Sequence, residues 1–226
     1  MIKRIIFFNW LLFFGLVGSA AAELIVIGTA YYDEYKNSGD YKLIYDDDLQ
    51  ITWLDYTKWA ANWENQRAWA ANLENALTIK LDPGYRANWS NTQWRLPAAL
   101  NQLYNWKCDG TGTAGYNVTS SEVGHLFYTA LGNKGYYDDN CNVLGNTGLV
   151  NTGPFDNLVE SWYWAGTDYT VDPNDTGRAW IFNTYNGHQV LTYKYRGQLG
   201  LGVRPGKVEY VPIGSLSAVN LLLLKP

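Results

Sequence analysis

The sequence predicts an α+β fold with two helices, short antiparallel strands and long loops. Strand-like segments occur near both ends of the chain, and two segments between them have helical periodicity. Residues 132–161 are rich in Gly, Asn and Asp and show neither pattern, which is typical of long loops. Strands placed early and late, with helices between them, fit the α+β class.

The first strands are predicted near the start of the mature chain. Residues 24–30 are apolar and rich in β-branched side chains, which is typical of a strand. Residues 41–45 and 50–54 predict two more strands around Asp46-Asp47-Asp48. This pattern predicts a β-hairpin.

A first helix is predicted to begin at Asn62, whose side chain can cap exposed backbone N–H groups. Glu64 would lie near the positive end of the helix dipole. We expect the helix to pack on a sheet through its Trp63 side, and the turn at residues 82–84 to end the segment. The apolar residues that recur at helical spacing are Trp63, Ala70, Leu73 and Leu77.

A second helix is predicted from the capping box Thr119-Ser120-Ser121-Glu122. In this motif the Thr119 oxygen and the Glu122 carboxylate satisfy each other's exposed backbone donors. Gly132 is predicted to end the helix. The apolar stripe between these ends consists of Val123, Leu126, Phe127, Ala130 and Leu131.

The last third of the chain returns to strand patterns. Asn186-Gly187 is a strong signal for a hairpin turn between two of these strands. The predicted strands cover residues 161–167, 178–184, 189–195 and 200–204.

The first 22 residues have the pattern of a secretory signal peptide. Lys3 and Arg4 precede an apolar run, and small residues at positions 18–22 form a cleavage site. The alternative is an uncleaved anchor helix, but the run is short for a bilayer span, which needs about 20 residues. The remaining chain is predicted to form one domain over residues 23–210, followed by a short apolar tail over residues 211–226.

The composition of the mature chain limits its partners. Once Lys3 and Arg4 are removed, the 21 acidic residues outnumber the basic ones, and no basic run offsets them. Nucleic acid is therefore not expected as a partner, and membrane contact is expected only through the signal peptide or the tail. The chain also has 11 Trp and 18 Tyr residues, a surplus beyond core needs that favours an aromatic binding face.

Cys108 and Cys141 are the only cysteines. Export would place both in an oxidising compartment, so a disulfide between them is favoured over two free thiols. That bond would close a loop of about 34 residues and stabilise the fold by roughly 3 to 4 kcal/mol. With only two histidines, His125 and His188, the chain shows no recognisable zinc-binding spacing.

Several short motifs carry a resemblance to a known family. They are Leu43-Ile44-Tyr45-Asp46-Asp47, Thr52-Trp53-Leu54, Trp94-Arg95-Leu96-Pro97, Tyr163-Trp164-Ala165-Gly166-Thr167, Ala179-Trp180-Ile181-Phe182 and Val203-Arg204-Pro205-Gly206. On these motifs the chain resembles the DUF1566 family, also called the Lcl C-terminal domain, over roughly residues 24–210, and most closely its secreted Gram-negative members. The resemblance implies a C-type-lectin-like fold related to formylglycine-generating enzymes, whose close pair of catalytic cysteines is absent here.

Members of that family often end in a PEP-CTERM sorting signal. Here the apolar run near residues 215–224 is too short to span a bilayer, and the Pro-Glu-Pro-like motif is missing. A single lysine, Lys225, replaces the usual basic cluster. We interpret the tail as a degenerate or truncated sorting signal, or as a loosely packed terminal segment.

Six residues are candidates for binding a ligand. Arg95 and Arg204 lie in apolar surroundings, where a guanidinium can hold a carboxylate or sulfate, although a structural ion pair is favoured. Strand alternation sends alternate aromatic residues to opposite faces, so part of the aromatic group is expected in the core. The aromatic candidates for stacking on sugar rings are Trp162, Trp164, Tyr169 and Trp180.

Metal and catalytic motifs are weak. Asp172, Asn174 and Asp175 resemble the start of a calcium loop, but Asn183 stands where such a loop needs a bidentate glutamate. An Asx-type turn is therefore favoured over a calcium site, and no cofactor is expected. The acids at residues 46–48 and 138–139 resemble a glycosidase pair only in composition, so no catalytic residues are assigned.

These observations favour a secreted, periplasmic or outer-envelope binding module without catalytic activity. A polysaccharide or glycan is the expected partner, and the acidic balance favours neutral glycans over the sulfated ones that the family's collagen-like adhesin engages. One alternative is an extracellular carbohydrate hydrolase, which needs two partly buried carboxylates facing across a cleft. The other is a structural envelope or matrix protein, which would lack an aromatic-lined concavity.

Overall fold

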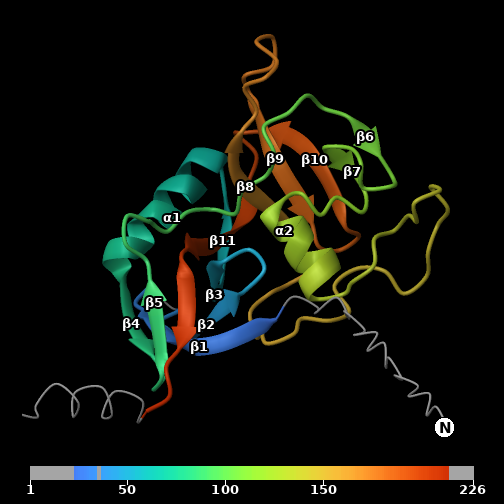
Figure 1. The fold of residues 1–226 in the computed structure, drawn as a ribbon. Coiled ribbons are helices and arrows are strands. Elements are labelled where there is room, and N and C mark those ends of the chain that lie inside the picture. Colours follow the sequence, from blue (N-terminus) through green and yellow to red (C-terminus); the bar gives the residue numbers. More distant parts are fainter. Residues whose placement is uncertain (1–22, 35–36, 214–226) are drawn as a thin grey trace, which may run out of the picture.

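The structure is a computed structural model that describes residues 23–34 and 37–213 (Figure 1). The predicted signal peptide and most of the predicted tail lie outside the described residues. The described fold is mixed and mostly sheet, with two short helices, which is compatible with the α+β prediction. No described helix is long and apolar enough to cross a membrane.

A ten-stranded sheet runs through the molecule in the order β4-β1-β2-β3-β11-β8-β9-β10-β7-β6, and β5 and β12 form a separate pair. β11 joins the two halves of the large sheet, because it pairs antiparallel with β3 and parallel with β8. The strands are β1 (Leu24–Tyr32), β2 (Gly39–Asp46), β3 (Ile51–Ala61), β4 (Leu77–Leu81), β5 (Tyr85–Asn88), β6 (Trp106–Lys107), β7 (Ala114–Gly115), β8 (Trp162–Asp168), β9 (Arg178–Asn183), β10 (His188–Tyr193), β11 (Gln198–Pro205) and β12 (Lys207–Tyr210).

The predicted strands are confirmed at both ends of the chain. β2 and β3 form the expected hairpin, with Asp46 opposite Ile51. β9 and β10 form the second hairpin, where Gly187 has the positive φ of 77° that this turn requires. The sequence did not predict β4 to β7 or β12. β4 alternates between apolar and polar residues, but its first residue, Leu77, was assigned to the helix. The other four strands have only two to four residues, which is too short for a clear alternation.

The first helix, α1 (Trp63–Ala76), begins as predicted. The Asn62 side chain accepts a hydrogen bond of 2.9 Å from the backbone N–H of Asn65. The helix ends before Leu77, which begins β4 instead of forming the last helical contact. The prediction that Leu77 belongs to the first helix is therefore wrong.

Close approach of α1 to the sheet requires glycine in β11. A Cβ atom on Gly202 would lie 2.6 Å from Leu73 Cδ1, and one on Gly200 would lie 2.6 Å from Gln66 Oε1. Gln66 is buried, and its side-chain amide donates to the carbonyls of Trp59 (2.7 Å) and Gln198 (2.9 Å). The helix therefore rests directly on the backbone of β11 and β3.

The second helix, α2 (Glu122–His125), begins two residues later than the capping box predicts. Ser121 is the N-cap in place of Thr119, and its Oγ accepts from the N–H of Gly124 at 3.1 Å. The Glu122 carboxylate binds the Arg95 guanidinium instead of a capping donor. The capping-box prediction is wrong because a charge-assisted pair takes the glutamate.

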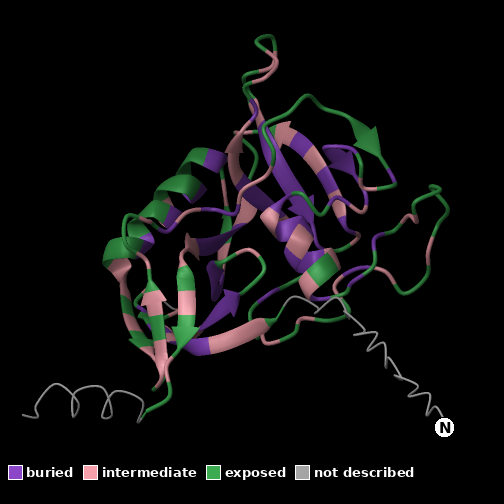
Figure 2. Ribbon diagram, viewed as in Figure 1, coloured by how far each residue is buried: buried purple, intermediate pink, exposed green. Residues whose placement is uncertain are grey.

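The two helices cover opposite faces of the sheet (Figure 1). Two consecutive residues of β8, whose side chains point to opposite faces, show this. Trp164 packs with Trp63 of α1, and Tyr163 packs with α2. A single π-helical turn, Leu126–Ala130, continues α2, and its residues Leu126 and Phe127 are buried. Figure 2 shows the buried residues between these layers and the exposed outer side of α1.

The long loops predicted at residues 132–161 are present, and the predicted disulfide pins them. Only the isolated bridges Lys134–Gly148 and Tyr137–Val143 give this part of the described chain regular pairing. Cys141 is bonded to Cys108, and their Cα atoms lie 5.4 Å apart. The bond ties the loops to the segment between β6 and β7.

Replacing both cysteines by serine is expected to lower the free energy of unfolding by about 3 kcal/mol. The unfolded chain is then released from a closed loop of about 34 residues. Urea unfolding of C108S/C141S and of the native protein, each with and without a reductant, measures the difference. A native midpoint that does not respond to the reductant would contradict the prediction.

Asp55 of β3 holds the same loops to the sheet from the inside. Its buried side chain accepts hydrogen bonds from the backbone N–H groups of Asp156 (3.0 Å) and Asn157 (2.9 Å). Burial raises the pKa of Asp55, and these hydrogen bonds oppose the rise. The carboxylate therefore has a structural task and is occupied on both oxygens.

Asp55→Asn is expected to lose about 1–3 kcal/mol of stability, because its new amide group faces a backbone N–H and leaves a buried donor without an acceptor. Asp156→Asn makes the same substitution at an exposed loop position and should cost about 0.5 kcal/mol or less. Chemical denaturation of both variants compares the two sites. Equal midpoints would show that Asp55 is not the anchor.

Candidate functional site

Two surface grooves bring candidate residues together. The larger one, here called the helix groove, has a volume of about 1240 Å³ and lies between the outer side of α1 and residues 89–98. Gly166 and Thr167 at the end of β8 complete it. The lining includes Arg67, Ala68, Glu74, Trp89, Arg95 and Arg204.

Arg95 lines the helix groove but is held from inside. Its guanidinium forms two hydrogen bonds of 2.7 Å with the Glu122 carboxylate and donates to the Leu96 carbonyl at 3.0 Å. The Glu122 carboxylate also accepts from the backbone N–H of Ala98 at 2.7 Å. The bidentate fork of Arg95 is therefore occupied, which matches the structural interpretation favoured from the sequence.

Arg204 has a similar arrangement. One of its Nη atoms donates to Glu74 Oε1 at 3.0 Å and to the Thr92 carbonyl at 3.1 Å. The guanidinium also lies 5.0 Å from the centre of the Trp89 ring, at a distance typical of a cation–π contact. Arg204 therefore links β11 to α1 and to the segment that follows β5.

The second groove, here called the strand groove, opens over β8, β9 and β10. Its volume is about 470 Å³. Its aromatic lining residues are Trp162 and Tyr193, and its polar lining residues include Arg178, Arg196 and Gln198. Of the four aromatic candidates, Trp162 is the one that lines this groove.

Aromatic rings continue from both ends of the strand groove. On one side the Trp162 ring meets the His188 ring at 6.0 Å, and Trp106 donates from Nε1 to His188 Nε2 at 3.2 Å. Burial lowers the pKa of His188, in keeping with a neutral imidazole that accepts this bond. On the other side Tyr193 stacks on Tyr195, with ring centres 5.5 Å apart.

Tyr193 and Arg196 were not among the predicted ligand-binding residues. The sequence does carry a signal for them, since Tyr193-Lys194-Tyr195-Arg196 alternates aromatic and cationic residues at the end of a predicted strand. The Tyr193 and Tyr195 side chains are 52% and 71% exposed. Exposed aromatic residues at such a strand end are candidates for ligand contact.

The other aromatic candidates belong to the core. Trp164 and Trp180 are fully buried, and Tyr169 is only 3% exposed. The Trp164 indole N–H donates to the Ala61 carbonyl at 3.0 Å, and the Tyr169 hydroxyl accepts from the backbone of Tyr104 at 3.3 Å. No ring face is left for a sugar, so these three residues do not belong to the candidate site.

The weak calcium candidates form a closed turn. Asp172 Oδ1 accepts from the backbone N–H of Asn174 at 2.9 Å, which is an Asx turn. Asp175 is paired with the Arg178 guanidinium, and this pairing raises the pKa of Arg178. Within residues 23–34 and 37–213, no three His, Cys, Asp or Glu side chains are grouped so as to hold a metal ion.

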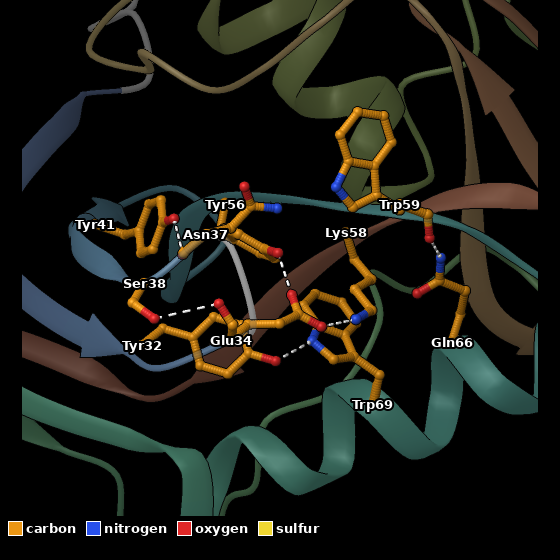
Figure 3. Close-up of polar contacts among 10 residues, drawn as sticks. All are labelled: Tyr32, Glu34, Asn37, Ser38, Tyr41, Tyr56, Lys58, Trp59, Gln66 and Trp69. Carbon is orange, nitrogen blue, oxygen red and sulfur yellow. Dashed lines mark hydrogen bonds and ion pairs between the residues drawn. The ribbon is translucent and has the colours of Figure 1, made fainter.

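A separate polar cluster, outside both grooves, lies between β1, β3 and α1 (Figure 3). Glu34 accepts hydrogen bonds from the Tyr56 hydroxyl and the Lys58 ammonium, and Trp69 donates to the Tyr32 hydroxyl at 3.1 Å. Burial lowers the pKa of Lys58. These side chains bind one another and line neither groove, so we interpret the cluster as structural.

The carboxylates of the grooves do not match a glycosidase. Glu64 and Glu74 both line the helix groove, but they are ten positions apart on α1 and so differ by about 15 Å along the helix axis. The two acids of a glycosidase lie roughly 5 to 9.5 Å apart. The described lining of the strand groove contains no acidic residue.

No protein family model, no curated protein and no solved structure matches this chain.

Arg95→Lys is expected to lower the free energy of unfolding by about 1–2 kcal/mol. Lysine keeps the charge but cannot form two parallel bonds with Glu122, and partial exposure of the pair limits the loss. Arg67→Lys is the matched control, because Arg67 is half exposed and its ion pair with Glu64 is long, at 3.7 Å. Thermal unfolding of both variants measures the contrast, and equal losses would contradict it.

Proposed function

We propose that this protein is a secreted or cell-envelope binding module for neutral glycans, without catalytic activity. The observation that carries the proposal is the strand groove, whose lining combines the aromatic residues Trp162 and Tyr193 with polar ones. An aromatic face can cover the apolar C–H side of a sugar ring at low entropic cost. Guanidinium and amide groups, here from Arg196 and Gln198, can bind the hydroxyl groups at the ring edge.

The proposal includes a C-type-lectin-like fold and membership of the DUF1566 family. The six sequence motifs support both, and the sheet-rich mixed fold with long loops is compatible with them. Export is supported by the signal-peptide pattern and by the Cys108–Cys141 disulfide, since such bonds persist in oxidising compartments. The acidic balance of the mature chain supports neutral over sulfated glycans.

Tyr193→Ala is expected to weaken glycan binding at least about tenfold, which corresponds to about 1.4 kcal/mol. The side chain is 52% exposed, so its loss should leave the fold intact. Tyr185→Ala is the matched control, because Tyr185 is 64% exposed and lines neither groove. The secreted protein is screened on a glycan array, and tryptophan fluorescence titration then measures the affinity of each variant.

Saturable binding without product formation is the expected result, and removal of calcium should not change it because the Asp172 turn is closed by its own contacts. Absence of binding to every glycan would overturn the proposal. Release of shorter sugars from a bound glycan would favour the hydrolase instead.

A further inference from the structure

The helix groove and the strand groove approach each other at one buried side chain, Trp63 of α1. Arg67, which lines the helix groove, has its guanidinium carbon 4.5 Å from the centre of the Trp63 ring. Lys194 has its ammonium nitrogen 4.7 Å from the same ring, and Trp63 belongs to the same apolar cluster as Ile181, which lines the strand groove. The Trp63 indole and its two cationic neighbours, Arg67 and Lys194, therefore separate the grooves, and we call these three residues the Trp63 ridge.

This ridge is held firmly in place. The Trp63 indole N–H donates to the Ala165 carbonyl at 2.8 Å, which fixes the ring on β8. Lys194 forms an ion pair with Asp168 at 2.6 Å and donates to the Thr176 carbonyl at 3.1 Å. Trp63 itself is buried, so the surface between the grooves is formed by the Arg67 and Lys194 side chains that lie over its ring.

The charges along both grooves are largely matched within the protein. Each paired arginine keeps further N–H groups for hydrogen bonding, but the partner carboxylate reduces the attraction of its positive charge for an anion. Such a lining suits an uncharged ligand rich in hydroxyl groups better than a polyanion. The pairs are Arg95–Glu122 and Arg204–Glu74 in the helix groove, and Arg178–Asp175 in the strand groove. Arg196 of the strand groove is in none of the described ion pairs, and its guanidinium lies 5.5 Å from the centre of the Tyr195 ring.

The size of the helix groove points to a long ligand. Its volume of about 1240 Å³ exceeds the range of roughly 300–1,000 Å³ that is usual for small-molecule sites. We infer that the two grooves form one track, across the Trp63 ridge, for an internal stretch of a long neutral polysaccharide. The inference rests on the proposed function and specifies its ligand as a chain bound along its length.

The test uses the neutral polysaccharide with the strongest array signal, cut into a graded series of lengths. Affinity is expected to rise at least about tenfold once an oligosaccharide is long enough to occupy both grooves, because the second contact is then intramolecular. Ala68→Gln places a longer, helix-compatible side chain in the helix groove and should remove this rise. Binding of the shortest oligosaccharides, which need only the strand groove, should remain.

Asn72→Gln is the control, because Asn72 is exposed on the same helix and does not line the groove. Affinity that is independent of length and insensitive to A68Q, but still lost in Y193A, would overturn the inference and leave the proposed function standing. Binding that A68Q abolishes for all lengths would also overturn it, since short chains would then require the helix groove. No binding at any length would reject both proposals.

Discussion

Two tryptophans bond reciprocally across the junction between α1 and β8, and the rest of the arrangement depends on this contact. The Trp63 indole donates to the Ala165 carbonyl at 2.8 Å, and the Trp164 indole donates to the Ala61 carbonyl at 3.0 Å. Both rings are buried, so each N–H group needs a partner inside the protein. The start of α1 is therefore fixed in register with β8, although about 100 residues separate them along the chain.

This placement of α1 leaves the two grooves open. The helix covers part of one sheet face, because Gly200 and Gly202 let it rest directly on β11. The part of β8, β9 and β10 that it leaves uncovered forms the strand groove, and its own outer side forms one wall of the helix groove. Both grooves are thus consequences of where one helix stops covering a sheet.

The sequence predicted those elements whose signals are local. The Asn62 cap and the Asn186-Gly187 turn depend on neighbouring residues, so their patterns were sufficient. The start of α2 was misplaced because Glu122 binds Arg95, and no local pattern shows a partner 27 positions away. Tertiary contacts of this kind override capping preferences.

The candidate site was predictable only in part for a similar reason. Trp162 and Trp164 lie on the same face of β8, and strand alternation treats them alike. The structure separates them because Trp164 lies under Trp63, whereas Trp162 lies opposite Asn183 at the end of the strand and reaches the strand groove. Full burial of Trp164 and partial burial of Trp162 depend on the position of α1, and the spacing of residues within the strand does not reveal that position.

The two buried aspartates of β2 and β3 hold the backbone of loops in place. Asp46 and Asp55 are buried, and burial raises the pKa of each, a feature shared with catalytic acids. Yet Asp46 accepts from the backbone of Leu49, Asp55 holds the loop at Asp156, and neither lines a groove. A general acid must reach the atom that it protonates. The perturbed acids are therefore part of the scaffold and belong to neither groove.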